Sequence, residues 1–237
     1  MDFGLSDEQV LLQDSLSRLL AKHAPLARTR AFADSGEARA DDVWQALIGL
    51  GLPGLLIAER HGGSGLGPIE CALVAECLGR HVAPVPFVAT SVLMPLALRL
   101  AGSPAQGEAW LPRLAQGAVI AGAALSELTG AREDAGVTCT DGRLHGRALF
   151  VLDFEADVYL VAGRDARLFL VAADAPGVSR RRFITIDRSR HVGELIFDRV
   201  QAEWLPGSAD AGIAHMLIDH GRVMRSEERR VGKECRL

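Results

Sequence analysis

The first half of the chain repeats apolar residues at the spacing of amphipathic helices. Ser6 and Gln9 have the spacing of a capping box, so the first helix is expected to begin near Asp7. The same periodicity predicts further helices after Asp41, between Gly67 and Gly79, over residues 87–101 and over residues 108–116. Residues 1–116 are therefore expected to form an all-α N-terminal domain.

Near Gly117 the spacing changes from about 3.6 residues to about two, which is typical of strands. Short runs rich in β-branched residues follow at 118–125, 137–140, 148–152, 158–162, 168–172, 178–186 and 194–197. Turn residues such as Asp141-Gly142 separate these runs, so residues 117–205 are expected to form a small antiparallel β-barrel or sandwich. Helical spacing returns over residues 206–224. The predicted fold class is α+β.

Composition excludes several classes of protein. The 237 residues are enough for a large core without disulfide staples. The 26 basic and 30 acidic side chains give a net charge of −4, so no basic excess indicates a nucleic-acid partner. The longest apolar run, residues 87–98, is too short to span a membrane. Because the N-terminus has no basic leader and the four cysteines are scattered, we expect a cytoplasmic protein with reduced thiols.

Short local motifs reveal no catalytic constellation. The glycines of residues 49–54 match a dinucleotide-binding pattern, but they follow a helix instead of a strand, so a helix-to-loop turn is expected. The glycines of residues 62–67 lack the lysine of a phosphate loop and are interpreted as a flexible surface turn. Glu70 and Glu76 are six residues apart and do not share a helix face. The seven histidines lack the spacing of metal ligands, so no metal site is expected.

A set of longer motifs resembles the acyl-CoA dehydrogenase family. The motifs are Met1-Asp-Phe-x-Leu-Ser-Asp-Glu-Gln9, Trp44-x-x-Leu47, Leu50-Gly-Leu-x-Gly54-Leu, Glu59-Arg-His-Gly-Gly-Ser-Gly-Leu66 and Glu76-x-Leu-Gly-Arg80. The resemblance runs in order from Met1 to about Met224. It implies a helical domain over 1–116, a β domain over 117–205 and a C-terminal helical bundle, of which only the start, 206–224, is present.

The resemblance also implies an activity. Members of this family are flavoprotein oxidoreductases of lipid metabolism and fatty acid β-oxidation, and they use FAD to oxidise the Cα–Cβ bond of an acyl-CoA thioester. The partners it implies are the acyl-CoA substrate, an electron acceptor such as an electron-transfer flavoprotein, and further subunits of a homo- or hetero-oligomer.

The flavin-binding segments of the family correspond to four residues of this sequence, Leu125, Ser126, Phe150 and Leu152. Ser126 keeps a hydroxyl where the family has threonine, and Phe150 can wall the flavin ring where the family has tryptophan. Leu152 cannot make the hydrogen bond of the family's threonine, and residues 130–134 replace a Gly-Ser-Asp turn. The alternative is that Phe150 and Leu152 are ordinary β core on alternate faces.

The catalytic glutamate of the family lies in its C-terminal domain, so no residue of this chain is assigned as catalytic and the chain alone is expected to be inactive. Residues 225–237 resemble the translation of a sequencing adapter, so we expect a foreign tail on a truncated dehydrogenase. Two other interpretations stay open. One is a non-catalytic partner subunit of a heteromeric acyl-CoA dehydrogenase, and the other is a related acyl-CoA or flavin oxidase.

Overall fold

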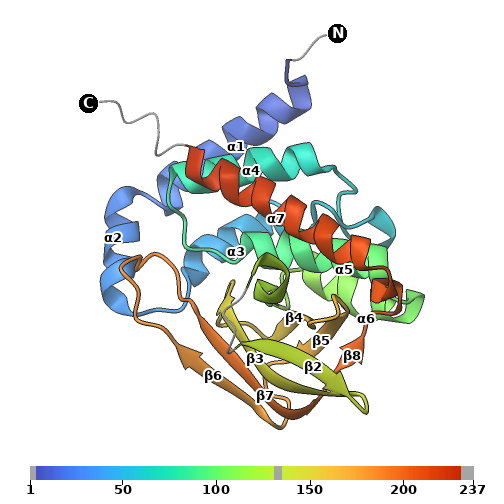
Figure 1. The fold of residues 1–237 in the computed structure, drawn as a ribbon. Coiled ribbons are helices and arrows are strands. Elements are labelled where there is room, and N and C mark those ends of the chain that lie inside the picture. Colours follow the sequence, from blue (N-terminus) through green and yellow to red (C-terminus); the bar gives the residue numbers. More distant parts are fainter. Residues whose placement is uncertain (1–3, 131–134, 231–237) are drawn as a thin grey trace.

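The computed structural model describes residues 4–130 and 135–230, in which a layer of helices is stacked on two β-sheets (Figure 1). The predicted α+β class is therefore confirmed, with a helical first half and a β-rich second half. The replaced turn at 130–134 lies, apart from Gly130, outside the described residues.

The helical layer begins where the capping box predicted. In α1 (Asp7–His23) the Ser6 hydroxyl accepts the N–H of Gln9 at 3.3 Å, and the Gln9 side chain accepts the N–H of Ser6 at 3.0 Å. The other helices of the layer are α2 (Leu26–Ser35), α3 (Asp41–Gly49), α4 (Pro68–Arg80), α5 (Met94–Ala101) and α6 (Pro104–Ala115).

Two features of this layer differ from the prediction. The helix α2 was missed because only Thr29 and Phe32 are buried along it, which is too few to give a clear apolar stripe. The single helix expected over 87–101 is instead a π-helical segment, η3 (Val88–Leu93), that continues into α5. Short 3₁₀ turns, η1 (Leu52–Gly54) and η2 (Glu59–His61), connect α3 to α4.

The strands form two four-stranded sheets, which confirms the sandwich prediction. One sheet has the order β1 (Ala121–Ala124), β4 (Val158–Ala162), β5 (Leu168–Ala172), β8 (Glu203–Trp204). The other has the order β2 (Gly136–Thr140), β3 (Arg143–Val151), β7 (Gly193–Gln201), β6 (Val178–Arg182). The named strands pair antiparallel, as predicted, except that β1 and β4 pair in parallel.

A backbone bridge beside β1 joins the two sheets. Ala123 and Leu152 each donate a backbone N–H to the carbonyl of the other at 2.9 Å. The bridge lies just after β3, so it fixes the position of the segment that carries Phe150 and Leu152. The 3₁₀ turn η4 (Ser126–Thr129) follows β1 along the chain.

The last helix, α7 (Ala211–Arg230), follows the turn η5 (Pro206–Ala209) and returns to the helical layer. It lies along α4 and η3, across the front of that layer (Figure 1). The helix passes Met224 without a break, so it does not mark the junction expected between native and foreign residues, and residues 231–237 lie outside the described part. The domain limits at 116, 205 and 224 and the foreign tail stay predictions.

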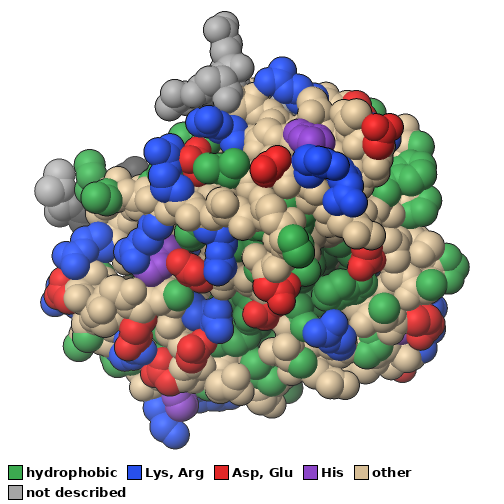
Figure 2. Space-filling view, turned by 90° about the horizontal axis from the view of Figure 1, so that it is seen from below, with side chains coloured by type: hydrophobic (Ala, Val, Ile, Leu, Met, Phe, Trp, Pro, Cys, Tyr) green, Lys and Arg blue, Asp and Glu red, His purple; other side chains and the backbone are tan. Residues whose placement is uncertain are grey.

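The face seen from below carries Arg, Asp and Glu side chains interspersed, with apolar side chains gathered in a hollow (Figure 2). This mixture agrees with the small net charge of −4. Within the described ranges, no helix is long and apolar enough to cross a membrane.

Candidate functional site

An apolar cavity of about 230 Å³ lies where the helical layer meets the sheets. Four segments form its walls, namely η3, the end of β1 with η4, the end of β3 and the middle of α7. The residues that line it are Val88, Leu93, Ala123, Leu125, Ser126, Thr129, Phe150, Leu152, Leu217, Ile218, Gly221, Arg222 and Arg225. All four residues expected from the sequence to contact a flavin are among them.

Phe150 is the most unusual of these residues. It lies at an irregularity in the pairing of β3 with β7, and its φ of +53° is in the left-handed region that bulky residues avoid. This backbone turns the ring outward, so 62% of the residue is exposed, and the ring makes an edge contact with Phe183 at 5.8 Å between centroids. The interpretation of Phe150 as ordinary β core was therefore wrong.

Leu152 agrees only partly with the core interpretation. Its side chain is half-buried, and it packs against the core while also lining the cavity. Its main chain is held by the bridge to Ala123, so the direction of the side chain is fixed by the junction of the two sheets. Leu125, which is 7% exposed, forms the neighbouring apolar wall.

Ser126 supplies the polar group next to these walls. Its Oγ accepts the N–H of Leu149 at 3.2 Å, and its carbonyl accepts the hydroxyl of Thr129 at 3.0 Å. Among the described residues no acceptor is in place for the Ser126 hydroxyl proton. The group is therefore oriented by the protein and free to donate one hydrogen bond toward the cavity.

Sequence patterns missed the two walls contributed by helices. Leu217 and Ile218 of α7 and Val88 and Leu93 of η3 line the cavity, and the two segments are in contact with each other. Periodicity showed that both segments are helical, but it could not show that two segments more than a hundred residues apart meet. The π-helical form of η3 also changes which of its side chains face the cavity.

The charged side chains of the described lining are those of Arg222 and Arg225, both on α7. Arg222 pairs with Asp219 of its own helix at 3.0 Å, and none of the described lining side chains is a carboxylate. The cavity can therefore enclose a flat or chain-like apolar group, with Ser126 as a hydrogen-bond donor to it. The described lining offers no general base.

The motifs that pointed to other chemistry have structural roles. Glu70 accepts the N–H of Gly67 at 2.9 Å and the Gln9 amide at 2.7 Å, and the latter bond is the largest cause of its lowered pKa. Glu76 instead pairs with Arg80 at 3.3 Å, so the two carboxylates act separately as predicted. In the part of the chain that the structure describes, no group of three or more His, Cys, Asp or Glu residues could hold a metal ion.

The glycine-rich loop over 62–67 is a turn, and backbone hydrogen bonds hold it against residues 54–57. Ser64 and Gly65 donate backbone N–H groups to the carbonyls of Gly54 and Ile57 at 3.0 and 2.8 Å. A Cβ built on Gly63 would lie 2.0 Å from the Ile57 carbonyl oxygen. These glycines therefore allow the close approach of two backbone segments, which corrects the interpretation of a flexible turn.

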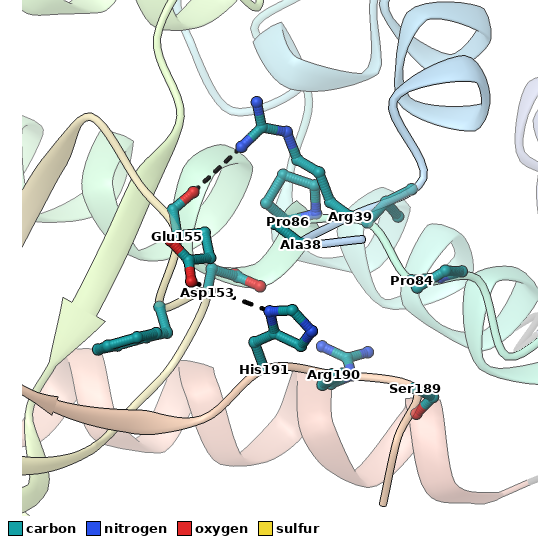
Figure 3. Close-up of a pocket in the computed structure, with 11 residues that line it drawn as sticks. Ala38, Arg39, Pro84, Pro86, Asp153, Glu155, Ser189, Arg190 and His191 are labelled. Atoms are coloured by element: carbon teal, nitrogen blue, oxygen red, sulfur yellow. Dashed lines mark hydrogen bonds and ion pairs between the residues drawn. The ribbon is translucent and has the colours of Figure 1, made fainter. Parts of the chain in front are cut away.

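A second, polar cavity lies between the helical and β layers (Figure 3). Arg39 donates to the carbonyl of Glu155 at 3.1 Å, and His191 Nδ1 lies 3.9 Å from the Glu155 carboxylate. Burial of His191, together with the nearby positive charge of Arg182, lowers its pKa, while Glu155 opposes the shift. The space of about 30 Å³ holds about one water molecule, so this cavity is a junction between layers and not a substrate site.

Comparison with known proteins agrees with this architecture. Residues 6–118 match the family model described as Acyl-CoA dehydrogenase, N-terminal domain. The acyl-CoA dehydrogenase IpdE2 of Mycobacterium tuberculosis is 34% identical over 143 residues, which are 58% of this chain and 44% of that protein.

Two solved structures share the whole arrangement. The "Tcur3481-Tcur3483 steroid ACAD" variant is 32% identical with a TM-score of 0.82, over 95% of this chain and 63% of that chain. The ChsE4-ChsE5 complex from Mycobacterium tuberculosis is 25% identical with a TM-score of 0.85, over 98% of this chain and 65% of that chain.

A helical N-terminal domain followed by a two-sheet domain is the arrangement that this chain shares with these similar structures. The helical domain of this chain belongs to the acyl-CoA dehydrogenase family. The chain spans about half the length of the curated relatives that it matches, between 44% and 55% for the first three.

Proposed function

We propose that this chain supplies the helical and β domains of a FAD-dependent acyl-CoA dehydrogenase and that the apolar cavity is where flavin and acyl chain meet. One observation carries the proposal. Leu125, Ser126, Phe150 and Leu152, which lie on two separate segments, line one cavity that is closed by helices α7 and η3.

The residues present fit a flavin ring in part. Leu125 and Leu152 offer apolar walls, the Phe150 ring is exposed beside them, and Ser126 offers one oriented hydroxyl donor. Flavin rings are flat, largely apolar and edged with hydrogen-bond acceptors, so this set can hold one. The fit is weaker than a fully polar lining would give, because Leu152 provides no hydrogen bond.

When bound, FAD supplies the hydride acceptor for oxidation of the Cα–Cβ bond of an acyl-CoA thioester. The residues of this chain bind and orient. Ser126 would donate its hydroxyl to the flavin ring, and Phe150 would cover part of the ring. Val88, Leu217 and Ile218 form an apolar channel that takes the acyl chain and keeps water from it. Proton abstraction needs a base from outside the described lining, and we propose that this chain alone binds the flavin without turnover.

A non-catalytic partner subunit is the second candidate function. Leu152 supports it, because a subunit without its own catalytic turnover does not need the hydrogen bond that Leu152 has lost. Two similar structures carry the names of paired proteins, Tcur3481-Tcur3483 and ChsE4-ChsE5. In this version the chain contributes its cavity to a hetero-oligomer with a second subunit of the same family. An acyl-CoA or flavin oxidase stays a third possibility, and the cytoplasmic location stays a prediction.

All of these candidate functions require FAD in the cavity, so FAD binding is tested first. The purified chain is titrated into FAD while the flavin fluorescence is followed, and quenching is expected to saturate. Phe150→Ala is expected to weaken binding about tenfold, because it removes a stacking surface from an exposed position. Ile186→Ala, at a fully exposed position of the same domain, is the matched control and is expected to bind FAD like the parent.

Absence of saturable binding, or equal binding by the two variants, would contradict the proposed cavity. The candidates are then separated with the longer protein. Reduction of its flavin by an acyl-CoA indicates the dehydrogenase, oxygen consumption during that reduction indicates the oxidase, and no reduction until a second subunit is added indicates the partner.

A further inference from the structure

A third cavity, which shares no residue with the proposed flavin site, lies between the turn η2 and the helices α5 and α6. Its volume is about 280 Å³, which is room for a small organic molecule and not only for water. Helices α5 and α6 lie side by side at the edge of the helical layer (Figure 1). Apolar side chains form one side of the cavity, and they are Leu56, Ile57, Pro95, Leu98 and Leu111.

His61 is the buried polar group of this cavity. Its side chain is 4% exposed, and its Nε2 accepts the Nε–H of Arg60 at 3.1 Å. Because arginine only donates, Nε2 carries no proton in this contact, and the proton of the neutral ring is on Nδ1. That Nδ1 has no hydrogen-bond partner among the described residues, since the nearest carboxylate oxygen, of Glu108, is 3.7 Å away.

The charge around His61 is positive. Arg60 and Arg99 both line the cavity, and in the described structure no carboxylate lies within ion-pair distance of either guanidinium. Glu108 is the single acidic residue of the lining. Two guanidinium groups and one carboxylate leave one net positive charge beside a buried N–H donor, and this combination suits a monoanion.

We propose that this cavity binds a small carboxylate with a short apolar tail. The carboxylate would accept from His61 Nδ1 and pair with Arg60 and Arg99, while the tail would lie on Ile57 and Leu98. A dianion such as phosphate fits less well, because it has no part for the apolar wall and it would face Glu108 with a second negative charge. The proposal is independent of the flavin cavity, because the two share no residue.

Butyrate titrated into the full chain tests the proposal, with the imidazole ¹⁵N signals of His61 and the binding heat as readouts. We expect saturation at about millimolar concentration, with a change at Nδ1 and little at Nε2. Butyramide, which has the same tail and no charge, is expected to bind at least about tenfold more weakly. Equal binding of the acid and the amide would overturn the proposal.

Three variants locate the site. Arg99→Gln, at an exposed position, is expected to weaken butyrate binding about tenfold, and Glu108→Gln is expected to strengthen it by removing a like charge. Arg113→Gln, which is on α6 but outside the cavity, is the matched control and should change nothing. If Arg99→Gln and Arg113→Gln behave alike, Arg99 does not hold the carboxylate and the proposal fails. If butyrate binds only to Glu108→Gln, Glu108 itself satisfies the site, and the proposal fails as well.

Discussion

The hydroxyl of Thr90 exchanges two hydrogen bonds with the backbone of Ala121. It accepts the Ala121 N–H at 3.0 Å and donates to the Ala121 carbonyl at 3.2 Å, and Thr90 is completely buried. Thr90 lies in η3 and Ala121 begins β1, so this pair fixes two walls of the proposed flavin cavity relative to each other. A side chain thereby joins the helical layer to the sheet at the point where the cavity forms.

Replacing Thr90 with valine keeps the volume but leaves the backbone of Ala121 without these partners. Because an unsatisfied buried polar group costs roughly 1–3 kcal/mol, we expect Thr90→Val to lower the free energy of unfolding by about that amount. Urea unfolding followed by circular dichroism measures it. Thr138→Val, at an exposed position of β2, is the control and should change stability by less than about 0.5 kcal/mol. Equal stability of the two variants would show that the Thr90 bonds contribute nothing.

The polar junction of Figure 3 predicts a dependence of stability on pH. His191 has a pKa below its ordinary value of 6.5, so just below pH 6.5 the unfolded chain binds more protons than the folded one. The contribution of His191 to stability is therefore complete above about pH 6.5 and is lost as the pH falls through the lowered pKa. Arg182 and Glu155 are the charged groups that act on the ring, and Arg39, Asp153 and Arg190 line the same cavity.

Unfolding in urea at pH 7.5 and 5.5 measures this effect. His191→Gln is expected to reduce the loss of stability between the two pH values, while His145→Gln, in the described strand β3 and away from this junction, should leave it unchanged. A loss that is the same in both variants would contradict the assignment to His191.

The cysteines are expected to differ in reactivity. Burial raises the pKa of the Cys71 thiol to about 12, and burial also raises the pKa of Cys77, whereas Cys139 is only half-buried. Since the thiolate is the reactive form, iodoacetamide at pH 8 should modify Cys139 well before Cys71. Peptide mass spectrometry over a time course measures the order, and unfolded protein, in which the two should react alike, is the control. Faster labelling of Cys71 in the folded protein would contradict its burial.

Gly63 is predicted to be intolerant of a side chain. A Cβ at this position would lie 2.0 Å from the Ile57 carbonyl, so Gly63→Ala must separate two hydrogen-bonded segments and should cost at least about 2 kcal/mol. Gly49→Ala is the matched control, because a Cβ there meets open space at the end of α3. Thermal unfolding of both variants measures the loss of stability. A Gly63→Ala variant as stable as the parent would mean that the loop moves away from Ile57 without cost.

Leu152→Thr tests the weakest part of the proposed flavin site. The bridge to Ala123 holds the backbone of residue 152, so a threonine hydroxyl would be presented to the cavity from the same position. We expect FAD to bind about fivefold more tightly, as one added hydrogen bond of about 1 kcal/mol gives. Leu66→Thr, on the surface of the helical layer, should not change the affinity measured by flavin fluorescence. An unchanged affinity in Leu152→Thr would place the flavin elsewhere.

The sequence by itself determined the helical first half, the change to strands near Gly117 and the return to a helix after Pro206. These features depend on apolar spacing and on local signals such as the Ser6 capping box, and both act over a few residues. The resemblance to a family added an expectation of which side chains bind the flavin. It singled out Leu125, Ser126, Phe150 and Leu152 as flavin-binding residues, and that role stays a proposal; the structure places all four around one cavity.

Tertiary structure alone decided how those side chains are presented. The outward position of Phe150 comes from a positive φ at an irregularity in β3, and no local sequence pattern predicts this backbone conformation. The cavity also needs α7 beside η3, a contact between segments far apart in the chain. Packing also decides the state of His61, because its Nδ1 lacks a hydrogen-bond partner among the described residues only through the positions of Arg60 and Glu108. Spacing fixes which face of an element is apolar, but only packing decides which elements share a cavity, because that depends on contacts that no short window contains.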